Sequence, residues 1–149
     1  MDELKELRAR VQALEDKDAI RKLKAIYWIC LDQKRWSDFA DCFAEDAVIE
    51  VPPATRTVGR AEILKTLPQG PDSVLTAHHG HHYDIELTGE TTARGIWAMY
   101  DNVQIPRISE SREGYGWYEE QYVKVNGRWK IKYMTLSRIF IFTEKTATT

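Results

Sequence analysis

Residues 75–87 read Leu-Thr-Ala-His-His-Gly-His-His-Tyr-Asp-Ile-Glu-Leu, and they divide the chain into two parts with different patterns. Before this stretch, apolar residues recur at three- and four-residue spacings, which is typical of amphipathic helices. After it, long runs rich in aromatic and β-branched residues are separated by turns, and Asn126-Gly127 is the strongest hairpin signal. Helices followed by a meander of antiparallel strands predict an α+β fold, in which a curved sheet packs on the N-terminal helices.

The same patterns place the individual elements. We expect helices over residues 2–14, 18–34, 36–44 and 59–67, and strands over residues 47–51, 83–88, 91–105, 114–125 and 128–142. No linker divides the chain, so residues 1–149 are expected to form a single domain. Within it, residues 1–15 hold an amphipathic N-terminal helix and residues 143–149 form a loose tail.

The N-terminal helix has a seam of four apolar residues. Leu4, Leu7, Val11 and Leu14 alternate at three- and four-residue steps with charged residues between them, as in a coiled coil. A helix of this length is not stable alone in water. We therefore expect it to pack either on its own domain or on a neighbouring subunit.

Composition excludes several classes of protein. The chain has 149 residues, of which 30% are charged and 43% hydrophobic, and its net charge of −2 argues against nucleic-acid binding. No apolar stretch is long enough to span a membrane, and the charged N-terminus does not resemble an export signal, so a cytoplasmic location is expected. Cys30 and Cys42 have neither metal-ligand nor disulfide spacing, and we interpret both as reduced and packed.

Two charged residues fall on apolar faces of predicted strands. Alternate residues of a strand share a face, so Asp101 lies on the same face as Trp97 and Met99, while Arg138 lies among Leu136 and other apolar residues of the last strand. A buried carboxylate or guanidinium needs a partner. Arg138 could meet Asp101, Asp32 or a ligand oxygen, and a purely structural Arg–Asp bridge is an equal alternative.

The four histidines are candidates for proton transfer, because histidine titrates near neutral pH. Counting back from Leu87 without a break turns His79 and His81 inward and His78 outward, unless a bulge at Gly80 reverses the order. From the residues alone, His79 or His81 would be the base. A metal site that combines His79, His81 and a carboxylate is a weaker alternative, because no third ligand stands out.

Several separate patches resemble one family. They are Asp18–Lys24 running into Tyr27 and Asp32, then His78-His79-Gly80-His81, Trp97 with Tyr100-Asp101, and Ser137-Arg138-Ile139-Phe140. With these, the chain from about Leu14 to Phe142 resembles the SnoaL-like branch of the nuclear-transport-factor-2-like fold, a cone-shaped roll. It is most similar to the bile acid 7α-dehydratase type, and it also resembles hexachlorocyclohexane dehydrochlorinases and, more distantly, scytalone dehydratase.

The resemblance implies a catalytic set. Position by position, it assigns site roles to Tyr27, Asp32, His78, Asp101 and Arg138. It favours His78 over the histidines that strand parity selects, so it requires a break in alternation near the glycine that follows. The dehydrochlorinases are similar in pairing an aspartate with a histidine at these positions.

The chain also departs from the family. Val51 stands where the dehydratases tend to carry a tyrosine, and the serine and asparagine of the scytalone type are replaced near Gly116 and Tyr118. A substrate carbonyl would then lose one hydroxyl donor.

The resemblance further implies a cofactor-independent, metal-free lyase of the dehydratase type, acting on a small hydrophobic, cyclic, steroid-like or polyketide-like substrate. An isomerase or cyclase on the same scaffold, or a small-molecule-binding module without chemistry, are the alternatives. Neither nucleic acid nor membrane is an expected partner. A homo-oligomer is expected, with a trimer favoured and a dimer as the alternative.

Overall fold

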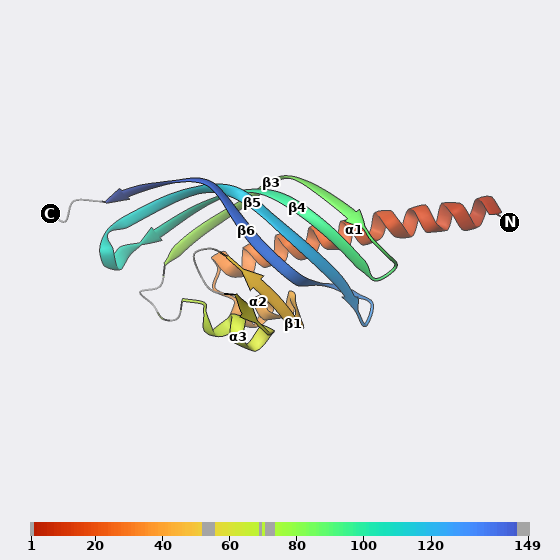
Figure 1. Ribbon diagram of the computed structural model, residues 1–149, viewed down its shortest axis with the longest axis horizontal. Helices are drawn as coiled ribbons and strands as arrows, with labels where there is room; N and C mark the ends of the chain where they lie inside the picture. Colours follow the sequence, from red (N-terminus) through yellow and green to blue (C-terminus); the bar gives the residue numbers. More distant parts are fainter. Residues whose placement is uncertain (1, 52–55, 69, 71–73, 146–149) are drawn as a thin grey trace.

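The computed structural model describes residues 2–51, 56–68, 70 and 74–145. Its elements follow in the order α1 (Asp2–Asp32), α2 (Trp36–Asp41), β1 (Phe43–Glu50), β2 (Thr57–Val58), α3 (Arg60–Lys65), β3 (Leu75–Leu87), β4 (Thr92–Ile105), the 3-10 turn η1 (Pro106–Ile108), β5 (Glu110–Val125) and β6 (Arg128–Lys145). The strands form one six-stranded sheet in the order β2-β1-β6-β5-β4-β3, which arches over the helices (Figure 1). The fold is therefore the mixed α+β roll that the sequence predicts.

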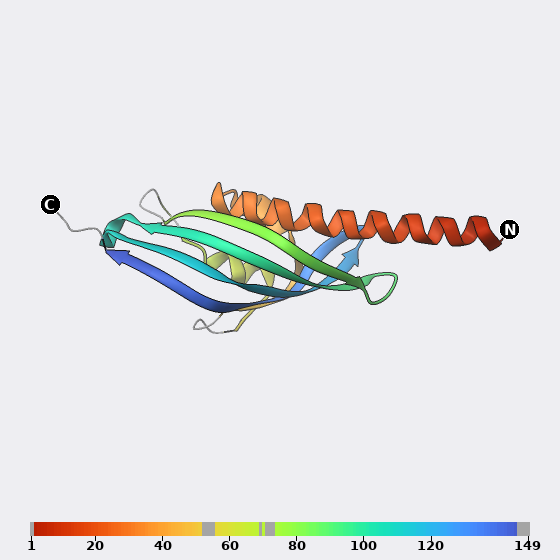
Figure 2. The ribbon, with the colours of Figure 1, turned by 90° about the horizontal axis from the view of Figure 1, so that it is seen from above.

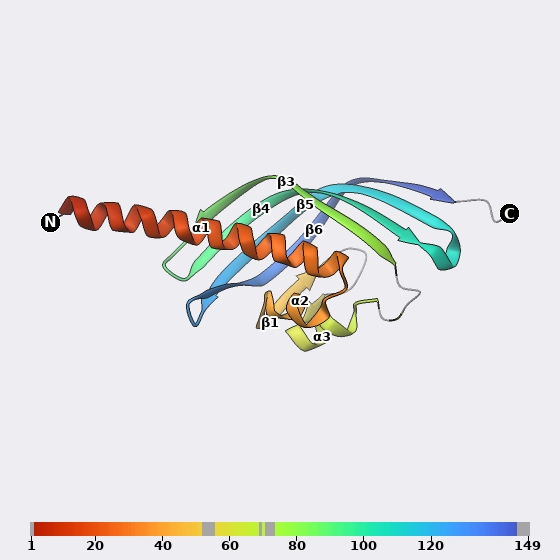
Figure 3. The same cartoon turned by 180° about the vertical axis from the view of Figure 1, so that it is seen from behind.

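The two expected N-terminal helices are one continuous helix, α1. No proline or glycine interrupts residues 2–32, so nothing in the sequence breaks the helix between its two segments. The helix ends at Asp32, and Lys34 takes a positive φ of 59° just beyond it. The second half of α1 lies along one face of the sheet, whereas the first half projects beyond it (Figures 2 and 3).

The long strands β3 to β6 pair antiparallel, and β1 pairs parallel with β6. Several of them begin or end elsewhere than the sequence suggests. β3 starts at Leu75 rather than Tyr83, β5 starts at Glu110 rather than Gly114, and β6 reaches Lys145, so residues 143–145 are not a loose tail. Each extension pairs with a neighbouring strand, and this long-range pairing outweighs the weak local strand propensity of the added residues.

Smaller differences concern the short elements. The helix expected over 36–44 ends at Asp41, because Phe43 and Ala44 already belong to β1. The helix expected over 59–67 is limited to Arg60–Lys65. The end of the expected tail, residues 146–149, lies outside the described residues.

Two register shifts in β6 correct the assignment of its faces. One separates Ile131 from Tyr133 and the other separates Arg138 from Phe140. Strict alternation counted from Arg138 predicts an outward position for Trp129 and Ile131, but both are buried on the inner face. Beyond the second shift, Phe140 leaves the inner face, because it pairs with Tyr115 on the outer face of β5.

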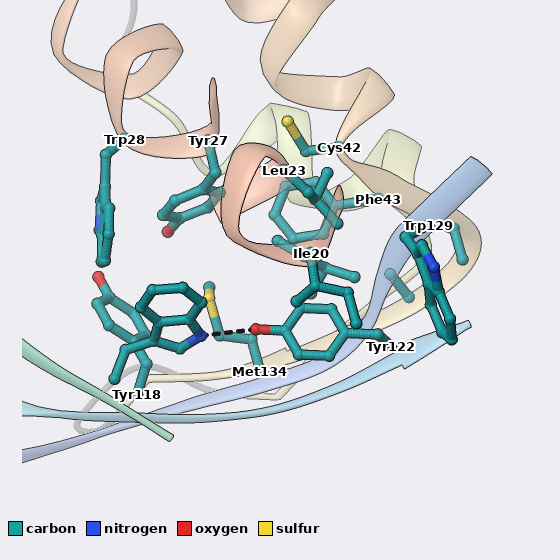
Figure 4. Packing of buried hydrophobic residues seen from close by; sticks show 14 of the residues in the cluster. Ile20, Leu23, Tyr27, Trp28, Cys42, Phe43, Tyr118, Tyr122, Trp129 and Met134 are labelled. Atoms are coloured by element: carbon teal, nitrogen blue, oxygen red, sulfur yellow. Dashed lines mark hydrogen bonds between the residues drawn. The ribbon is translucent and has the colours of Figure 1, made fainter. Parts of the chain in front are cut away.

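The core lies between the inner face of the sheet and the second half of α1, with α2 and β1 closing it. The residues drawn in Figure 4 include Ile20, Leu23, Tyr27 and Trp28 from α1, facing Tyr118, Tyr122, Trp129 and Met134 from the sheet. The indole nitrogen of Trp97 donates a hydrogen bond of 2.7 Å to the hydroxyl of Tyr122, which is the dashed line in the figure. No helix among the described residues is long and apolar enough to cross a membrane.

Candidate functional site

The first half of the site joins the end of α1 to the beginning of β3. Nδ1 of His78 lies 2.6 Å from Oδ1 of Asp32, and the backbone N–H of His78 donates to Oδ2 of the same carboxylate over 2.8 Å. The hydroxyl of Thr76 donates to Oδ1 over 2.9 Å, and Nζ of Lys34 donates to that hydroxyl over 3.0 Å. Both oxygens of Asp32 are therefore engaged, and His78 is held at two points, its ring nitrogen Nδ1 and its backbone N–H.

These contacts change the acidity of the carboxyl group. Partial burial of Asp32 by itself raises its pKa, but the hydrogen bonds from the ring and backbone of His78 and from Thr76 favour the charged form. The pKa of Asp32 consequently lies below its ordinary value. An ionised carboxylate that accepts from Nδ1 selects the tautomer in which Nδ1 carries the hydrogen and Nε2 is free to accept a proton.

His78 points inward because the strand alternation breaks. In the β3–β4 ladder Gly80 pairs with Met99 and Tyr83 pairs with Trp97, so two residues of β3 oppose the single residue Ala98. The break in alternation that the resemblance requires between His78 and Tyr83 is confirmed, and the unbroken alternation that would turn His79 and His81 inward is wrong.

Gly80 borders this bulge, and its role is close approach. A Cβ on Gly80 would lie 2.0 Å from the Trp28 ring, so only glycine lets the indole of α1 pack on the β3 backbone.

The second half of the site is an ion pair on the inner face of the sheet. Nη1 and Nη2 of Arg138 each donate to one oxygen of Asp101 over 2.7 Å, which is a bidentate arrangement. The Asp101 side chain is buried and that of Arg138 is partly exposed. Gly114 makes room for the pair, since a Cβ there would lie 2.0 Å from Nη1 of Arg138 and 2.3 Å from Oδ1 of Asp101.

The two halves meet at the His78 ring. Nε2 of His78 lies 3.8 Å from Oδ2 of Asp101, which is too far for a hydrogen bond. Asp101 is neutralised by Arg138, whereas Asp32 bonds directly to the ring. The imidazole of His78 is thus hydrogen-bonded through Nδ1. Its other nitrogen, Nε2, lies beside the carboxylate of Asp101, whose charge Arg138 compensates.

Tyr27, the fifth residue of the predicted set, lies deeper. It is buried, and its ring contacts those of Trp28, Phe39, Phe43 and Tyr118. Burial raises the pKa of Tyr27 and of Tyr118, and the hydrogen bond from Tyr27 partly lowers the pKa of Tyr118. The charges of Asp101 and Arg138 also act on Tyr118. The ring centroids of Tyr27 and Tyr118 lie 6.3 Å apart, and both phenols are neutral at physiological pH because both pKa values are raised.

A buried charged network below Tyr27 was not predicted from the sequence. The ammonium group of Lys24 is buried among the rings of Tyr27, Trp28 and Tyr118, with its nitrogen 3.8 Å from the Tyr118 ring centroid. It bonds to the buried carboxylate of Glu120, which also accepts from the Tyr122 hydroxyl.

The signal that could have revealed this network is positional. Lys24 lies one turn from Ile20 and Tyr27 on the apolar face of the helix, and Glu120 shares a strand face with Tyr118 and Tyr122. Thr76 and Gly114 carry no comparable signal, because their roles depend on contacts with residues far away in the chain.

The remaining histidines have other surroundings. His79 is exposed and its ring lies 6.0 Å from that of Tyr100, while His82 lies 5.2 Å from Trp117 on the outer face. His81 lines a shallow groove between α1 and β3. Within the part of the chain that the structure describes, no three histidine, cysteine, aspartate or glutamate side chains gather as metal ligands. The structure therefore does not bring His79 and His81 to the side of Asp101.

Comparison with known proteins identifies the family to which the chain belongs. Residues 12–135 match the model of the SnoaL-like domain, which includes Asp32, His78 and Asp101 but not Arg138. A protein from Novosphingobium aromaticivorans, described as a candidate scytalone dehydratase, has a similar structure, with a TM-score of 0.78, 24% identity, and coverage of 94% of this chain and 93% of that one.

Two further structures share the fold at lower identity. Hexachlorocyclohexane dehydrochlorinase LinA-type3 from Novosphingobium barchaimii has a TM-score of 0.79 at 15% identity, over 94% of this chain and 99% of that one. ActVI-ORFA from Streptomyces coelicolor has a TM-score of 0.68 at 11% identity, over 83% and 96%. At these identities the likeness concerns the fold alone. Because the family model spans most of the chain, this protein belongs to the SnoaL-like domain family.

Proposed function

We propose that this protein is a cofactor-independent lyase that removes water from a small cyclic substrate of the steroid or polyketide kind, with His78 as the base. The observation that carries the proposal is the hydrogen bond of 2.6 Å between Nδ1 of His78 and Asp32. The other ring nitrogen, Nε2, lies 3.8 Å from Asp101 and has no hydrogen-bond partner among the residues that the structure describes. A base oriented by a carboxylate is the usual arrangement for proton abstraction. The dehydratase and dehydrochlorinase among proteins of this fold support an elimination.

The proposed elimination conserves atoms and electrons. Nε2 of His78 accepts the proton from a carbon next to a carbonyl or enone, and the electron pair of the C–H bond moves into a new C=C bond. The C–O bond to a hydroxyl group breaks, and the departing oxygen takes up the proton that Nε2 of His78 now carries, so that water leaves and the neutral imidazole is restored. Asp32 stabilises the imidazolium that forms, since it already bonds to Nδ1.

Charge that develops on the substrate oxygen needs donors. Tyr27 and Tyr118 are neutral phenols whose ring centroids lie 6.3 Å apart. We assign Tyr27 as the donor between their hydroxyls, because the contact raises the pKa of Tyr27 and lowers that of Tyr118. The Tyr118 hydroxyl is then available to donate to a substrate carbonyl or to the leaving oxygen. Tyr27 is accordingly a positioning residue behind Tyr118, which replaces the hydroxyl donor that the family carries elsewhere.

Asp101 and Arg138 act as a unit. The bidentate pair holds the buried carboxylate of Asp101 with one oxygen 3.8 Å from Nε2, so that the imidazolium has a carboxylate on both sides of the ring. Arg138 is the more exposed partner and can turn one nitrogen toward a polar group of the substrate. We expect the substrate to bind in a cavity beside these groups.

The test is a screen of hydroxylated 3-oxo-steroids and cyclic polyketides for loss of water, followed by mass spectrometry, with His78→Ala as the critical variant. We expect His78→Ala to keep the fold and to lower the rate by roughly a hundred- to ten-thousand-fold, the usual share of a general base. Asp32→Asn should reduce the rate as well, because the amide no longer compensates the imidazolium.

His79→Ala is the matched control, since His79 is the neighbouring residue but is exposed beside Tyr100. Its rate should stay close to that of the wild type. Running the screen in D2O separates the competing activities, because an isomerase would incorporate deuterium without losing water. If His79→Ala is as slow as His78→Ala, the assignment of the base is wrong, and binding without turnover would indicate a non-catalytic module.

A further inference from the structure

The first half of α1 carries an apolar seam that its own domain does not cover. Leu4, Leu7, Val11 and Leu14 are 56%, 48%, 53% and 68% exposed. The helix projects beyond the sheet over this length (Figure 1). The sequence leaves open whether this seam packs on its own domain or on another subunit. In the part of the chain that the structure describes, no other element of the domain covers the seam.

The seam ends where α1 reaches the fold. The next position of the same repeat is Asp18, which pairs with Lys22 and Arg21 on the helix surface. Asp16 is already buried, where it accepts a hydrogen bond from Trp129. The apolar repeat therefore covers only the projecting segment, residues 3–17.

The charges that flank the seam identify its partner. With Leu4 and Val11 at positions a and Leu7 and Leu14 at positions d, Glu3 and Arg10 occupy positions g, and Arg8 and Glu15 occupy positions e. In a parallel coiled coil each g residue faces the e residue five positions later in the other helix. Glu3 then faces Arg8, and Arg10 faces Glu15, so both pairs join opposite charges.

The antiparallel alternative is unfavourable by the same reasoning. In an antiparallel pair whose four apolar residues remain in contact, each e position near the middle of the seam faces an e position of the other helix. Each g position there likewise faces a g position. This brings Arg8 beside Arg8 of the other copy and Arg10 beside Arg10 of the other copy. The charge pattern thus selects one orientation of a self-complementary partner.

We infer that residues 3–17 of this chain form a parallel coiled coil with the same segment of another copy. The segment completes an interface rather than an active site, so the inference is independent of the proposed reaction. Parallel packing also agrees with cyclic symmetry, because a rotation axis along the coil places all N-terminal ends on the same side.

Cross-linking tests the orientation directly. Leu7→Cys places a thiol at a d position, where two copies of a parallel coil bring it face to face. Ala9→Cys is the control, because position f lies on the opposite side of the helix. The native Cys30 and Cys42 are buried, and burial raises the pKa of Cys42 to about 12, so neither competes. We expect Leu7→Cys, and not Ala9→Cys, to give a disulfide-linked dimer on mild oxidation.

Charge reversal provides a second, independent measurement. Glu3→Arg with Arg10→Glu replaces every attractive g–e pair by a repulsive one, and should weaken self-association by about tenfold or more in sedimentation experiments. Adding Arg8→Glu and Glu15→Arg should restore it. All of these residues are exposed, so the fold is not at risk. Failure of Leu7→Cys to cross-link would overturn the inference, and so would cross-linking only between Leu7→Cys and Val11→Cys, which would indicate antiparallel packing.

Discussion

Gly114 shows how a residue without a side chain shapes the site. It lies on β5 opposite Asp101, and the space that a Cβ would occupy is taken by the guanidinium of Arg138 and the carboxylate of Asp101. The pair can therefore form flat against the sheet. Here the reason for glycine is close approach of side chains and not an unusual backbone conformation.

This geometry predicts energetic coupling between Gly114 and Arg138. Gly114→Ala should displace Arg138 and leave Asp101 uncompensated, at a cost of about 2–4 kcal/mol in the free energy of unfolding. In an Arg138→Ala background the added methyl group meets only the Asp101 carboxylate, which Arg138 no longer holds in place. The double variant should therefore be more stable than the two single effects added together predict. Urea denaturation of the four proteins gives the coupling energy. Additive effects would show that the glycine does not serve the ion pair.

Asp32 predicts a specific dependence of stability on pH. The pKa of Asp32 is lowered in the folded protein, because hydrogen bonds from His78 and Thr76 outweigh the effect of burial. A group with a lowered folded pKa contributes stability that is fully present above its ordinary value of 3.8 and is lost as the pH falls through the folded value.

The difference in unfolding free energy between the wild type and Asp32→Asn should therefore be largest near neutral pH and should shrink below about pH 4. Asp18→Asn is the control, because Asp18 forms only exposed ion pairs with Arg21 and Lys22. Its effect should be small at every pH. A pH-independent difference for Asp32→Asn would mean that the carboxylate is not held by its partners.

At the scale of the elements, irregularities in two strands decide what faces inward. The bulge between Gly80 and Tyr83 in β3 turns His78 toward Asp32, and the shift after Arg138 in β6 separates the arginine from Phe140. Without the first shift His78 would lie outside, and without the second the two phenylalanines at the end of β6 would lie beside Arg138. Both irregularities border side chains of the candidate site, His78 and Arg138, and bulges are often found beside such sites.

The contact between α1 and β5 includes a buried ion pair, and we expect the stability of the fold to depend on it. Lys24 from α1 and Glu120 from β5 are both buried. Burial lowers the pKa of Lys24, and the charge and hydrogen bond of Glu120 offset only part of this lowering. Lys24→Met leaves a buried carboxylate without its cation, and Glu120→Gln leaves a buried ammonium without its anion, so each should cost about 3–5 kcal/mol.

The double variant Lys24→Met with Glu120→Leu should recover most of this loss, because it removes both charges and keeps the volume apolar. Chemical denaturation measures the cycle. The exposed pair Lys65–Glu62 is the control, and breaking it should change stability very little. If the double variant is as unstable as the singles, the network stabilises the fold through its hydrogen bonds to Tyr122 rather than through charge compensation.

For the whole molecule, the outer face of the sheet is unusually aromatic. Successive ring contacts run from His79 through Tyr100, Tyr115 and Phe140 to Phe142, across strands β3 to β6. Phe140 and Phe142 are 47% and 62% exposed. An exposed apolar band of this extent is typical of an interface. We propose that this face joins copies of the chain into a trimer, as the resemblance to the family suggests.

This proposal predicts the oligomeric state. The wild type should sediment as a trimer at micromolar concentration, and Phe140→Ser with Phe142→Ser should dissociate it without unfolding the monomer. Val58→Ser is the control, because Val58 is similarly exposed but lies on β2 at the far edge of the sheet. A monomeric wild type would contradict both this interface and the coiled coil, whereas a trimer that survives the serine substitutions would contradict only the sheet interface.

The sequence by itself determined the fold class, the order of helices and strands, and most of the charged residues of the candidate site. These features depend on local patterns: apolar spacing along α1, alternation along β4, and the Asn126-Gly127 turn. Asp101 on the inner face followed from alternation alone, because β4 pairs with β5 without a shift in register. For the same reason the burial of Trp97 and Met99 was predictable.

Only the tertiary structure decided which face His78, Trp129 and Phe140 occupy, and which charges meet. A bulge moves every following side chain to the other face, and its position depends on packing against distant residues, as Trp28 packs on Gly80. The bidentate bond of Arg138 to Asp101, and not to Asp32, depends on the space that Gly114 leaves. Lys24 and Glu120, which are buried against each other, are likewise 96 positions apart in the chain. Local sequence patterns specify no contact over such a separation.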